Sequence, residues 1–423
     1  MSAINAKASR KMKKYAVLTR EPRCFLGSLA FSWEQRKLAS LCEKFTDGDW
    51  IESKDQSDFG VRLVQTGNVG VAEYLDKPNN KKWISEDTFD RLHCEEVLPG
   101  DILISRLPEP AGRACIMPLL GAKMITAVDC TIVRTAPDMS NKFLVQYLSS
   151  QAYFDDVNIC LAGGTRQRIS RGNLANFDVP IPVKKSEQDA IGMFFGYLDN
   201  LITLHQRKFE KLTNVKKSML EKMFPQNGSS YPEIRFKGFT DPWEQRKAKE
   251  LFVSTADKGY PELPVLSATQ DRGMIRRDEN SINIFHDKKN EAGYKRVLPG
   301  QFVIHLRSFQ GGFAHSAIEG ITSPAYTVFG FSEPEKHDSE YWKYVFTSKS
   351  FIRRLETVTY GIRDGRSISY DEFLTLGFVY PSKAEQTAIA RYLDKLSDLI
   401  TLHQRELKKL QNIKKSMLEK MFV

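Results

Sequence analysis

The feature that most constrains this chain is a 24-residue segment that occurs twice. Residues 201–224 read LITLHQRKFEKLTNVKKSMLEKMF and residues 399–422 read LITLHQRELKKLQNIKKSMLEKMF, with 19 of the 24 positions identical. Two shorter segments, WEQRK and VLPG, also occur twice and in the same order, starting at Trp33 and Trp243 and at Val97 and Val297. A spacing of about 200 residues is too long for a solenoid, whose repeats run to roughly 20–50 residues. The sequence therefore predicts one unit, a domain followed by a helix, used twice.

Each unit ends in a stretch whose apolar residues lie three and four positions apart, which is typical of an amphipathic helix. The stripe of the first copy begins with Ile191 and Leu198, and that of the second with Ile389 and Leu396. Helices of this length with a single apolar stripe need a partner, and the obvious partner is the other copy. Lys208 and Glu210 in the first copy become Glu406 and Lys408 in the second. This reversal would favour pairing, although neutral surface drift explains it equally well.

The residues before each helix contain short strand-like runs separated by Gly, Pro and Asn, which favours mainly β domains with short helices. We expect an α+β chain with two such domains, divided as follows: a basic leader at 1–24, domain 1 at 25–185, helix 1 at 186–224, a linker at 225–241, domain 2 at 242–383 and helix 2 at 384–423.

Composition limits the class of protein. The 62 Lys and Arg residues outnumber the 52 Asp and Glu residues, giving a net charge of +10 that favours a polyanionic partner, nucleic acid first. The six cysteines form no CxxC pair, so a zinc site or redox motif is not expected, and scattered thiols in a long chain suggest a reducing cytoplasm. No run reaches the roughly 20 apolar residues that a membrane helix needs.

The motifs of common catalytic sites are missing. The chain has no adjacent prolines, which the [DNS]PP[YFW] loop of an adenine methyltransferase would require. It also has no GxGxxG, no GxxxxGK[ST] and no HExxH. Neighbouring carboxylates such as Asp155 and Asp156 lack a spaced partner and are interpreted as solvated charges. We therefore predict no catalytic residue and no metal ligand.

Taken in order, WEQRK, VLPG, GGTR, EQ-x-A-I and a long helix ending in KKSMLEKMF, given twice, resemble the specificity subunit of a type I restriction–modification system. The resemblance covers residues 25–423. It implies two target-recognition domains, each followed by a helix, with the two helices paired as an antiparallel coiled coil. It also implies that each domain reads one half of a bipartite, asymmetric site in double-stranded DNA.

The same resemblance implies a subunit without catalytic activity or a cofactor of its own. Its expected partners are two methylation subunits, which bind S-adenosylmethionine and methylate adenine, and the restriction and translocation subunits. The complex is expected in the cytoplasm, with no contact to a membrane.

Six arginines are candidates for DNA contact. Two follow the strands that begin after VLPG and lead into loops; they could read base edges or be ordinary surface charges. Four lie in GGTRQRIS at 163–170 and in its counterpart at 361–369, where a loop shared by two domains suits phosphate contact or a structural salt bridge better than base reading. The candidates are Arg106, Arg307, Arg166, Arg168, Arg363 and Arg366.

The identical KKSMLEKMF segments suggest two equivalent faces for two identical methylation subunits; internal packing is the alternative. The candidates for subunit contact are Lys217, Met219, Met223, Lys415, Met417 and Met421.

Two other classes of function remain open at this point. One is an enzyme, a fused or diverged DNA methyltransferase or nuclease, against which the missing proline pair argues. The other is a coiled-coil scaffold with no role in DNA binding, which salt-sensitive DNA binding would exclude.

Overall fold

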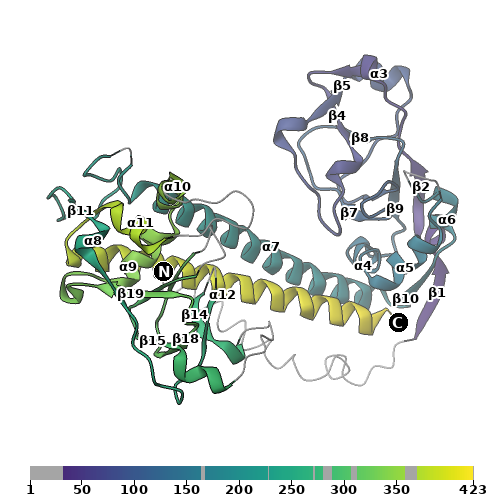
Figure 1. The fold of residues 1–423 in the computed structure, drawn as a ribbon. Coiled ribbons are helices and arrows are strands. Elements are labelled where there is room, and N and C mark those ends of the chain that lie inside the picture. Colours follow the sequence, from purple (N-terminus) through teal and green to yellow (C-terminus); the bar gives the residue numbers. More distant parts are fainter. Residues whose placement is uncertain are drawn as a thin grey trace. The chain divides into compact units, whose positions relative to one another are not determined.

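The computed structural model describes residues 32–162, 167–226, 228–269, 272–279, 288–305, 312–357 and 369–422. The chain forms two compact units (Figure 1). Unit 1 comprises residues up to Gln206 together with Arg405–Val423, and unit 2 comprises Arg207–Gln404. Among the described residues, no helix is both long enough and apolar enough to span a bilayer.

Unit 1 is built on two four-stranded sheets, with strand orders β2-β9-β6-β7 and β3-β5-β4-β8, and a separate pair β1-β10. Short helices cover the sheets, and the long helix α7 begins after β10. The elements are β1 (Trp33–Lys37), β2 (Cys42–Asp47), β3 (Gln56–Ser57), β4 (Val61–Val64), β5 (Lys82–Ile84), α3 (Glu86–Arg91), β6 (Ile102–Ser105), β7 (Ala114–Ile116), β8 (Met124–Thr126), β9 (Cys130–Thr135), α4 (Asn141–Tyr147), α5 (Gln151–Ile159), α6 (Arg171–Ala175), β10 (Asp178–Pro182) and α7 (Lys185–Lys222).

Unit 2 repeats this plan. Its four-stranded sheet has the order β12-β19-β16-β17, which matches β2-β9-β6-β7, and β11 pairs with β20 as β1 pairs with β10. The elements are β11 (Glu244–Lys247), α8 (Ala248–Leu251), β12 (Phe252–Thr255), β13 (Leu266–Thr269), β14 (Gly273–Arg276), β15 (Lys295–Val297), β16 (Phe302–Ile304), β17 (Phe313–His315), β18 (Gly320–Thr322), β19 (Thr327–Phe331), α9 (Ser339–Thr347), α10 (Lys349–Thr357), α11 (Tyr370–Thr375), β20 (Gly377–Tyr380) and α12 (Lys383–Met421).

The repeated VLPG segment is a turn that launches the central strand of each sheet. Gly100 and Gly300 have φ of +95° and +86°, a conformation that favours glycine. The residue after the glycine closes the turn, because the side chain of Asp101 accepts from the Leu98 N–H at 2.8 Å and that of Gln301 accepts from the Leu298 N–H at 2.8 Å. The motif is therefore shared because both domains need the same turn.

The end of each long helix packs into the domain that precedes the other helix. Leu418 and Phe422, at the end of α12, are buried in the core of unit 1, where Phe422 meets the rings of Trp33 and Phe143. Phe224, just after α7, is buried in unit 2 against Tyr341, with ring centroids 5.6 Å apart. Full burial of such a side chain stabilises the fold by roughly 1.5–3 kcal/mol.

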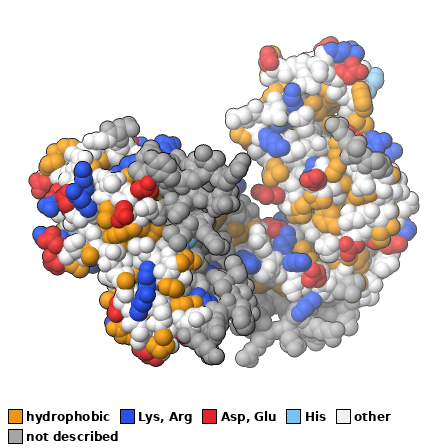
Figure 2. Space-filling view, viewed as in Figure 1, with side chains coloured by type: hydrophobic (Ala, Val, Ile, Leu, Met, Phe, Trp, Pro, Cys, Tyr) orange, Lys and Arg blue, Asp and Glu red, His pale blue; other side chains and the backbone are white. Residues whose placement is uncertain are grey.

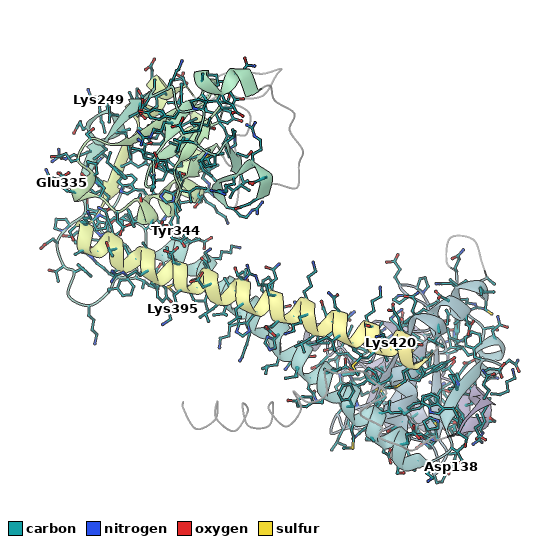
Figure 3. All side chains as sticks on the ribbon, turned by 90° about the horizontal axis from the view of Figure 1, so that it is seen from below. Asp138, Lys249, Glu335, Tyr344, Lys395 and Lys420 are labelled. Atoms are coloured by element: carbon teal, nitrogen blue, oxygen red, sulfur yellow. The ribbon has the colours of Figure 1, made fainter. Side chains whose placement is uncertain are left out.

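Within each unit, one long helix leaves the domain while the other arrives at it, so the two run antiparallel. In unit 1 they are linked by an ion pair between Lys414 of α12 and Asp199 of α7, 2.6 Å apart. This confirms the predicted fold class. In unit 2, Tyr344 of α9 lies beside α12 and donates from its hydroxyl to Asp394 at 2.7 Å (Figure 3).

The glutamine of the repeated EQ pair fixes the start of each long helix. The Gln188 side chain accepts from the Ser140 N–H and donates to the Pro182 carbonyl, both at 2.9 Å. Gln386 accepts from the Asp338 N–H at 2.9 Å and from Trp342 Nε1 at 3.2 Å, and it donates to the Pro381 carbonyl at 2.8 Å.

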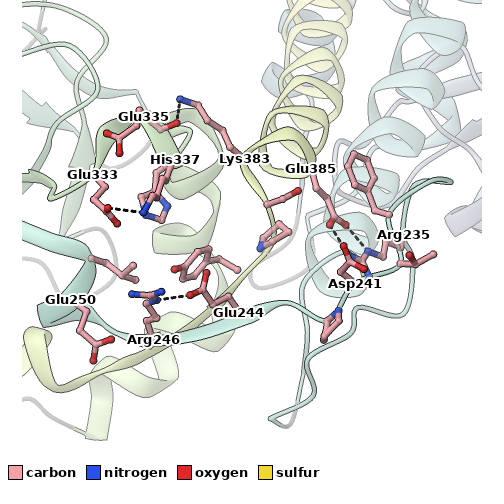
Figure 4. A pocket seen from close by; sticks show the side chains of 18 of the residues that line it. Arg235, Asp241, Glu244, Arg246, Glu250, Glu333, Glu335, His337, Lys383 and Glu385 are labelled. Carbon is pink, nitrogen blue, oxygen red and sulfur yellow. Dashed lines mark hydrogen bonds and ion pairs between the residues drawn. The ribbon is translucent and has the colours of Figure 1, made fainter.

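The segment at 225–241, which the sequence predicts to be a linker, packs on unit 2. Phe236 lies against its core, and the Arg235 guanidinium forms two hydrogen bonds of 2.8 and 2.7 Å with the Glu385 carboxylate (Figure 4). Glu385 is 1% exposed, so this bidentate pair holds the segment against the start of α12. The leader predicted at 1–24 lies outside the described residues.

Candidate nucleic-acid interface

The loops of unit 1 gather at one edge of its sheets. In the sheet β2-β9-β6-β7, antiparallel pairing brings the ends of β2 and β6 beside the starts of β7 and β9. In the second sheet, β4 and β8 run parallel and end together, and β5 starts beside them. A bond of 2.9 Å from Asp49 N, just after β2, to the Thr126 carbonyl in β8 joins the two sheets here. We call these segments the loop edge; they are residues 47–50, 65–82, 106–113 and 127–129.

Arg106 lies at this edge with its side chain buried and engaged within the domain, and its contact with DNA stays a prediction. Its side chain is 9% exposed, donates to the Val128 carbonyl at 2.6 Å and lies 3.5 Å from Asp47. Its own carbonyl accepts from the Ile169 N–H at 3.2 Å. Arg106 therefore joins three segments of the domain. In the sequence it is a single arginine after the apolar strand β6, and this pattern does not indicate that its side chain is buried.

The GGTRQRIS loop is tied to the same edge. Ala162 and Arg168 exchange two backbone hydrogen bonds of 3.2 and 2.9 Å, which close the loop at its base. The Arg168 guanidinium lies 3.8 Å from Asp129, and that of Arg171 lies 3.9 Å from Asp47. Arg168 is still 62% exposed, so this salt bridge leaves room for phosphate contact. Arg166 lies outside the described residues.

In unit 2 the matching loops are largely outside the described residues, among them 306–311 and 358–368. Three candidates, Arg307, Arg363 and Arg366, fall in these ranges and stay predictions. When the two VLPG segments are aligned, the position equivalent to Arg106 is Leu306, one residue before Arg307.

Sequence reasoning missed Arg113, which is 8% exposed. Its guanidinium donates to four carbonyls: Nε to Val69 at 2.6 Å, Nη2 to Thr66 at 2.9 Å, and Nη1 to Leu107 at 2.7 Å and to Pro110 at 2.9 Å. Burial lowers the pKa of Arg113 from its ordinary value. The only sequence signal was an arginine between small apolar residues, in AGRAC.

The loop edge also carries a basic segment that was not singled out, DKPNNKK at 76–82. Lys77 and Lys81 are exposed and Lys82 is half-buried. On the face of the described surface that Figure 2 shows, basic and acidic side chains are interspersed, so charge alone does not single out one region of that face.

The candidates for subunit contact divide into two groups. Lys217 and Lys415 are exposed, and Lys415 lies 3.8 Å from Glu419 on its own helix. Met223 is 2% exposed in the core of unit 2, so its side chain is occupied by internal packing. The three remaining methionines are half-buried against the cores of units 1 and 2; they are Met219, Met417 and Met421.

A charged cleft of about 620 Å³ in unit 2 runs along the start of α12 (Figure 4). Its cations are engaged within the unit: Arg235 pairs with Glu385, Arg246 with Glu244 at 2.5 Å, and Lys383 donates to the Glu335 carbonyl at 2.8 Å. Hydrogen bonding to Glu385 raises the pKa of Arg235. The bonds of Arg235 and Lys383 hold the segment at 225–241, which we call the lead-in, and the first turn of α12 in place.

The thiols of Cys94 and Cys130 and the imidazole of His315, which could act in catalysis elsewhere, are buried in the fold. Burial raises the pKa of the Cys94 and Cys130 thiols to about 11, which makes them poor nucleophiles. Burial lowers the pKa of His315, whose Nε2 lies 3.1 Å from Ser339 Oγ. Among the described residues, no three His, Cys, Asp or Glu side chains are placed to hold a metal ion.

Comparison with known proteins places this architecture. Residues 32–214 match the family model for the type I restriction modification DNA specificity domain. The chain is 18% identical over 417 residues to a putative type I restriction enzyme MjaX specificity subunit of Methanocaldococcus jannaschii, covering 93% of both chains. It is 25% identical over 260 residues to the type I restriction enzyme MjaVIII specificity subunit of the same organism, covering 57% of this chain and 60% of that protein.

A solved structure, the type I restriction–modification S subunit from M. genitalium, aligns with 94% of this chain and 98% of its own with a TM-score of 0.60. The identity of 13% makes this a likeness of fold. Together with the repeated motifs, the duplicated domain and the paired helices, these matches make the chain similar to type I restriction–modification specificity subunits, with residues 32–214 matching their DNA specificity domain.

Proposed function

We propose that this chain is the non-catalytic subunit that gives a type I restriction–modification complex its DNA sequence specificity. Each unit reads one half of a bipartite site. The observation that carries the proposal is the duplication: two domains with the same sheet order but different residues in their loops, each closed onto the same pair of helices. Two similar modules on one chain act as a dimer does on two half-sites. Because their loops differ, the site is asymmetric.

The reaction belongs to partner subunits. We propose that two methylation subunits supply S-adenosylmethionine and adenine methylation, and that restriction and translocation subunits join the same complex in the cytoplasm. The exposed Lys217 and Lys415, at equivalent positions of the repeated helix, suit a contact made twice by identical subunits. The catalytic motifs missing from the sequence favour a subunit that recruits activity over one that has its own.

The test is co-expression of the chain with its methylation subunit, followed by genome-wide mapping of methylated adenines. A single split motif is expected. Exchanging residues 38–177, which lie between the paired strands β1 and β10, for those of a relative with another target should change one half of the motif only.

The matched control exchanges residues 248–376, between β11 and β20, and should change the other half only. If either exchange altered both halves, the two units would not read independently. If the purified chain alone methylated DNA with S-adenosylmethionine, the alternative of a diverged methyltransferase would replace the proposal.

A further inference from the structure

Arg113 occupies an unusual position for a buried arginine. All four of its hydrogen bonds go to backbone carbonyls, two on the segment after β4 and two on the loop between β6 and β7. No carboxylate of the described residues pairs with it. A planar guanidinium can hold several acceptors at fixed positions at once, which a lysine ammonium does not do. Arg113 is therefore a clamp between two loops of the loop edge.

The loop between β4 and β5 is fixed at further points. The Asn68 side chain donates to the Leu75 carbonyl at 2.9 Å, and Ala72 N donates to the Ala114 carbonyl at 2.8 Å. The Lys77 ammonium lies over Gly67, 2.9 Å from the position that a Cβ would take there. The basic segment at 76–82 is thus fastened to the same turn that Arg113 holds.

The lysines of this segment outnumber its one acid, Asp76. Lys77, Lys81 and Lys82 form no ion pair within the described residues, and the buried guanidinium of Arg113 adds a fourth positive charge to the same pair of loops. Lysines without a carboxylate partner, beside the polar side chains of Asn79 and Asn80, are suited to phosphate oxygens.

The clamped loop between β6 and β7 brings a different chemistry to the edge. Its tip, Pro108, Glu109 and Pro110, is exposed, and two prolines restrict its backbone. A carboxylate repels phosphate, but it accepts hydrogen bonds from the amino group that cytosine shows in the major groove. The two loops therefore offer backbone contact and base contact side by side.

On the proposed function of the chain, we infer that this surface holds the first DNA half-site. Lys77, Lys81 and Lys82 contact phosphates, the tip at Glu109 faces the bases, and Arg113 is the positioning residue that sets one loop against the other.

The first test removes the three lysines together, in K77A/K81A/K82A, and measures binding of the complex to its target at several salt concentrations. Loss of three phosphate contacts should lower the slope of log affinity against log salt by about 2.7, at about 0.9 per contact. The motif should keep its sequence. The matched control, K54A/K123A/K142A, removes the same charge from the opposite edge of unit 1 and should leave the slope within a fraction of one contact. Equal slopes for the two triple variants would overturn the inference.

The second test is Arg113→Lys, which keeps the charge and removes the fork. Methylation mapping should show about tenfold weaker discrimination at one or more positions of the first half of the motif, with the second half unchanged as an internal control for assembly. If Arg113 served stability alone, total methylation would fall without any change of preference. That result, or a motif identical to the wild type, would contradict the positioning role.

Glu109→Ala completes the set at an exposed position of the loop tip. It should relax one position of the first half-site and leave the salt slope unaltered. Unchanged preference would remove the tip from the reading surface. Failure of the wild-type complex to give any split motif would instead count against the proposed function, so the two failures are distinguishable.

Discussion

Units 1 and 2 hold the same residues of the repeated helix in different ways. Lys414 of α12 forms a 2.6 Å ion pair with Asp199 in unit 1, whereas its equivalent Lys216 of α7 lies 5.6 Å from the centroid of the Tyr344 ring in unit 2. Ser397 stands where Asp199 would be, and Asp394, nearly one turn earlier, is bound by Lys343. Burial lowers the pKa of Lys216. Identical sequence in the two helices therefore does not imply identical energetics.

The buried glutamate at the start of each helix differs more. Glu385 has Arg235, while one carboxylate oxygen of Glu187 is buried without a hydrogen-bond partner among the described residues. Burial raises the pKa of Glu187, with Trp33 acting in the opposite direction through a hydrogen bond. Unit 1 therefore keeps a buried carboxylate, Glu187, that no arginine of the described residues neutralises. In unit 2 the equivalent carboxylate, Glu385, is neutralised by Arg235.

The largest change in stability is expected when Glu385 in unit 2 loses its arginine partner and so becomes like Glu187 in unit 1. Arg235→Met should leave Glu385 buried and unpaired and lower the free energy of unfolding by about 3–5 kcal/mol. Urea denaturation combined with hydrogen exchange would measure this and locate the loss in unit 2. In the double variant R235M/E385Q most of the stability should return. A double variant as unstable as R235M would show that packing of Arg235, and not the charge of Glu385, is decisive.

Gln188 and Gln386 should differ less in how much each contributes to the free energy of unfolding. Gln386→Ala should cost about 1 kcal/mol more than Gln188→Ala, because Gln386 makes one more hydrogen bond, with the buried indole of Trp342. The pair of free energies from denaturant unfolding measures it. Equal costs would mean that the bond to Trp342 contributes nothing net.

Replacing the equivalent lysines, Lys414 and Lys216, should change the stability of the two units in different directions. Lys414→Met removes one partner of a mostly buried ion pair and should destabilise unit 1 by about 1–2 kcal/mol. Lys216→Met removes a half-buried cation that has no carboxylate within ion-pair distance among the described residues, and it should be neutral or slightly stabilising. Thermal unfolding of the two variants under one buffer condition compares them directly. A loss of the same size in both would mean that the lysine stems, and not the charges, carry the effect.

Glu187→Gln should give a small effect with a distinct pH dependence. An acid whose pKa is higher in the folded state binds its proton more tightly there, so wild-type stability rises as pH falls through that raised pKa toward the ordinary value. The variant should be more stable than the wild type at pH 7–8, by about 1 kcal/mol, and lose this advantage under acid conditions. Stability measured at a series of pH values tests the sign. A constant difference at every pH would show that Glu187 does not titrate in this range.

The repeated segments made the duplicated architecture predictable, since a fixed spacing and an apolar stripe depend only on local sequence. Both long helices lie within two residues of the predicted bounds. The burial of Arg106 and Arg113 could not be predicted, because the sequence does not say whether an arginine side chain ends in solvent or among carbonyls. That depends on how distant loops meet. The lead-in at 225–241 looked like a linker because its prolines and glycines are turn residues, and its packing depends on a glutamate 150 positions away.

The burial of Leu418 and Phe422 in unit 1 also has a consequence for synthesis of the chain. A ribosome adds these residues after the whole of domain 2, yet they complete the core of domain 1. During translation the first domain must wait, with an apolar surface open at the site where three aromatic rings later meet Phe422. Synthesis of α12 is thus the step that completes the core of the first domain, and a chain that stopped before Leu418 would leave a defect about 200 residues upstream of the truncation.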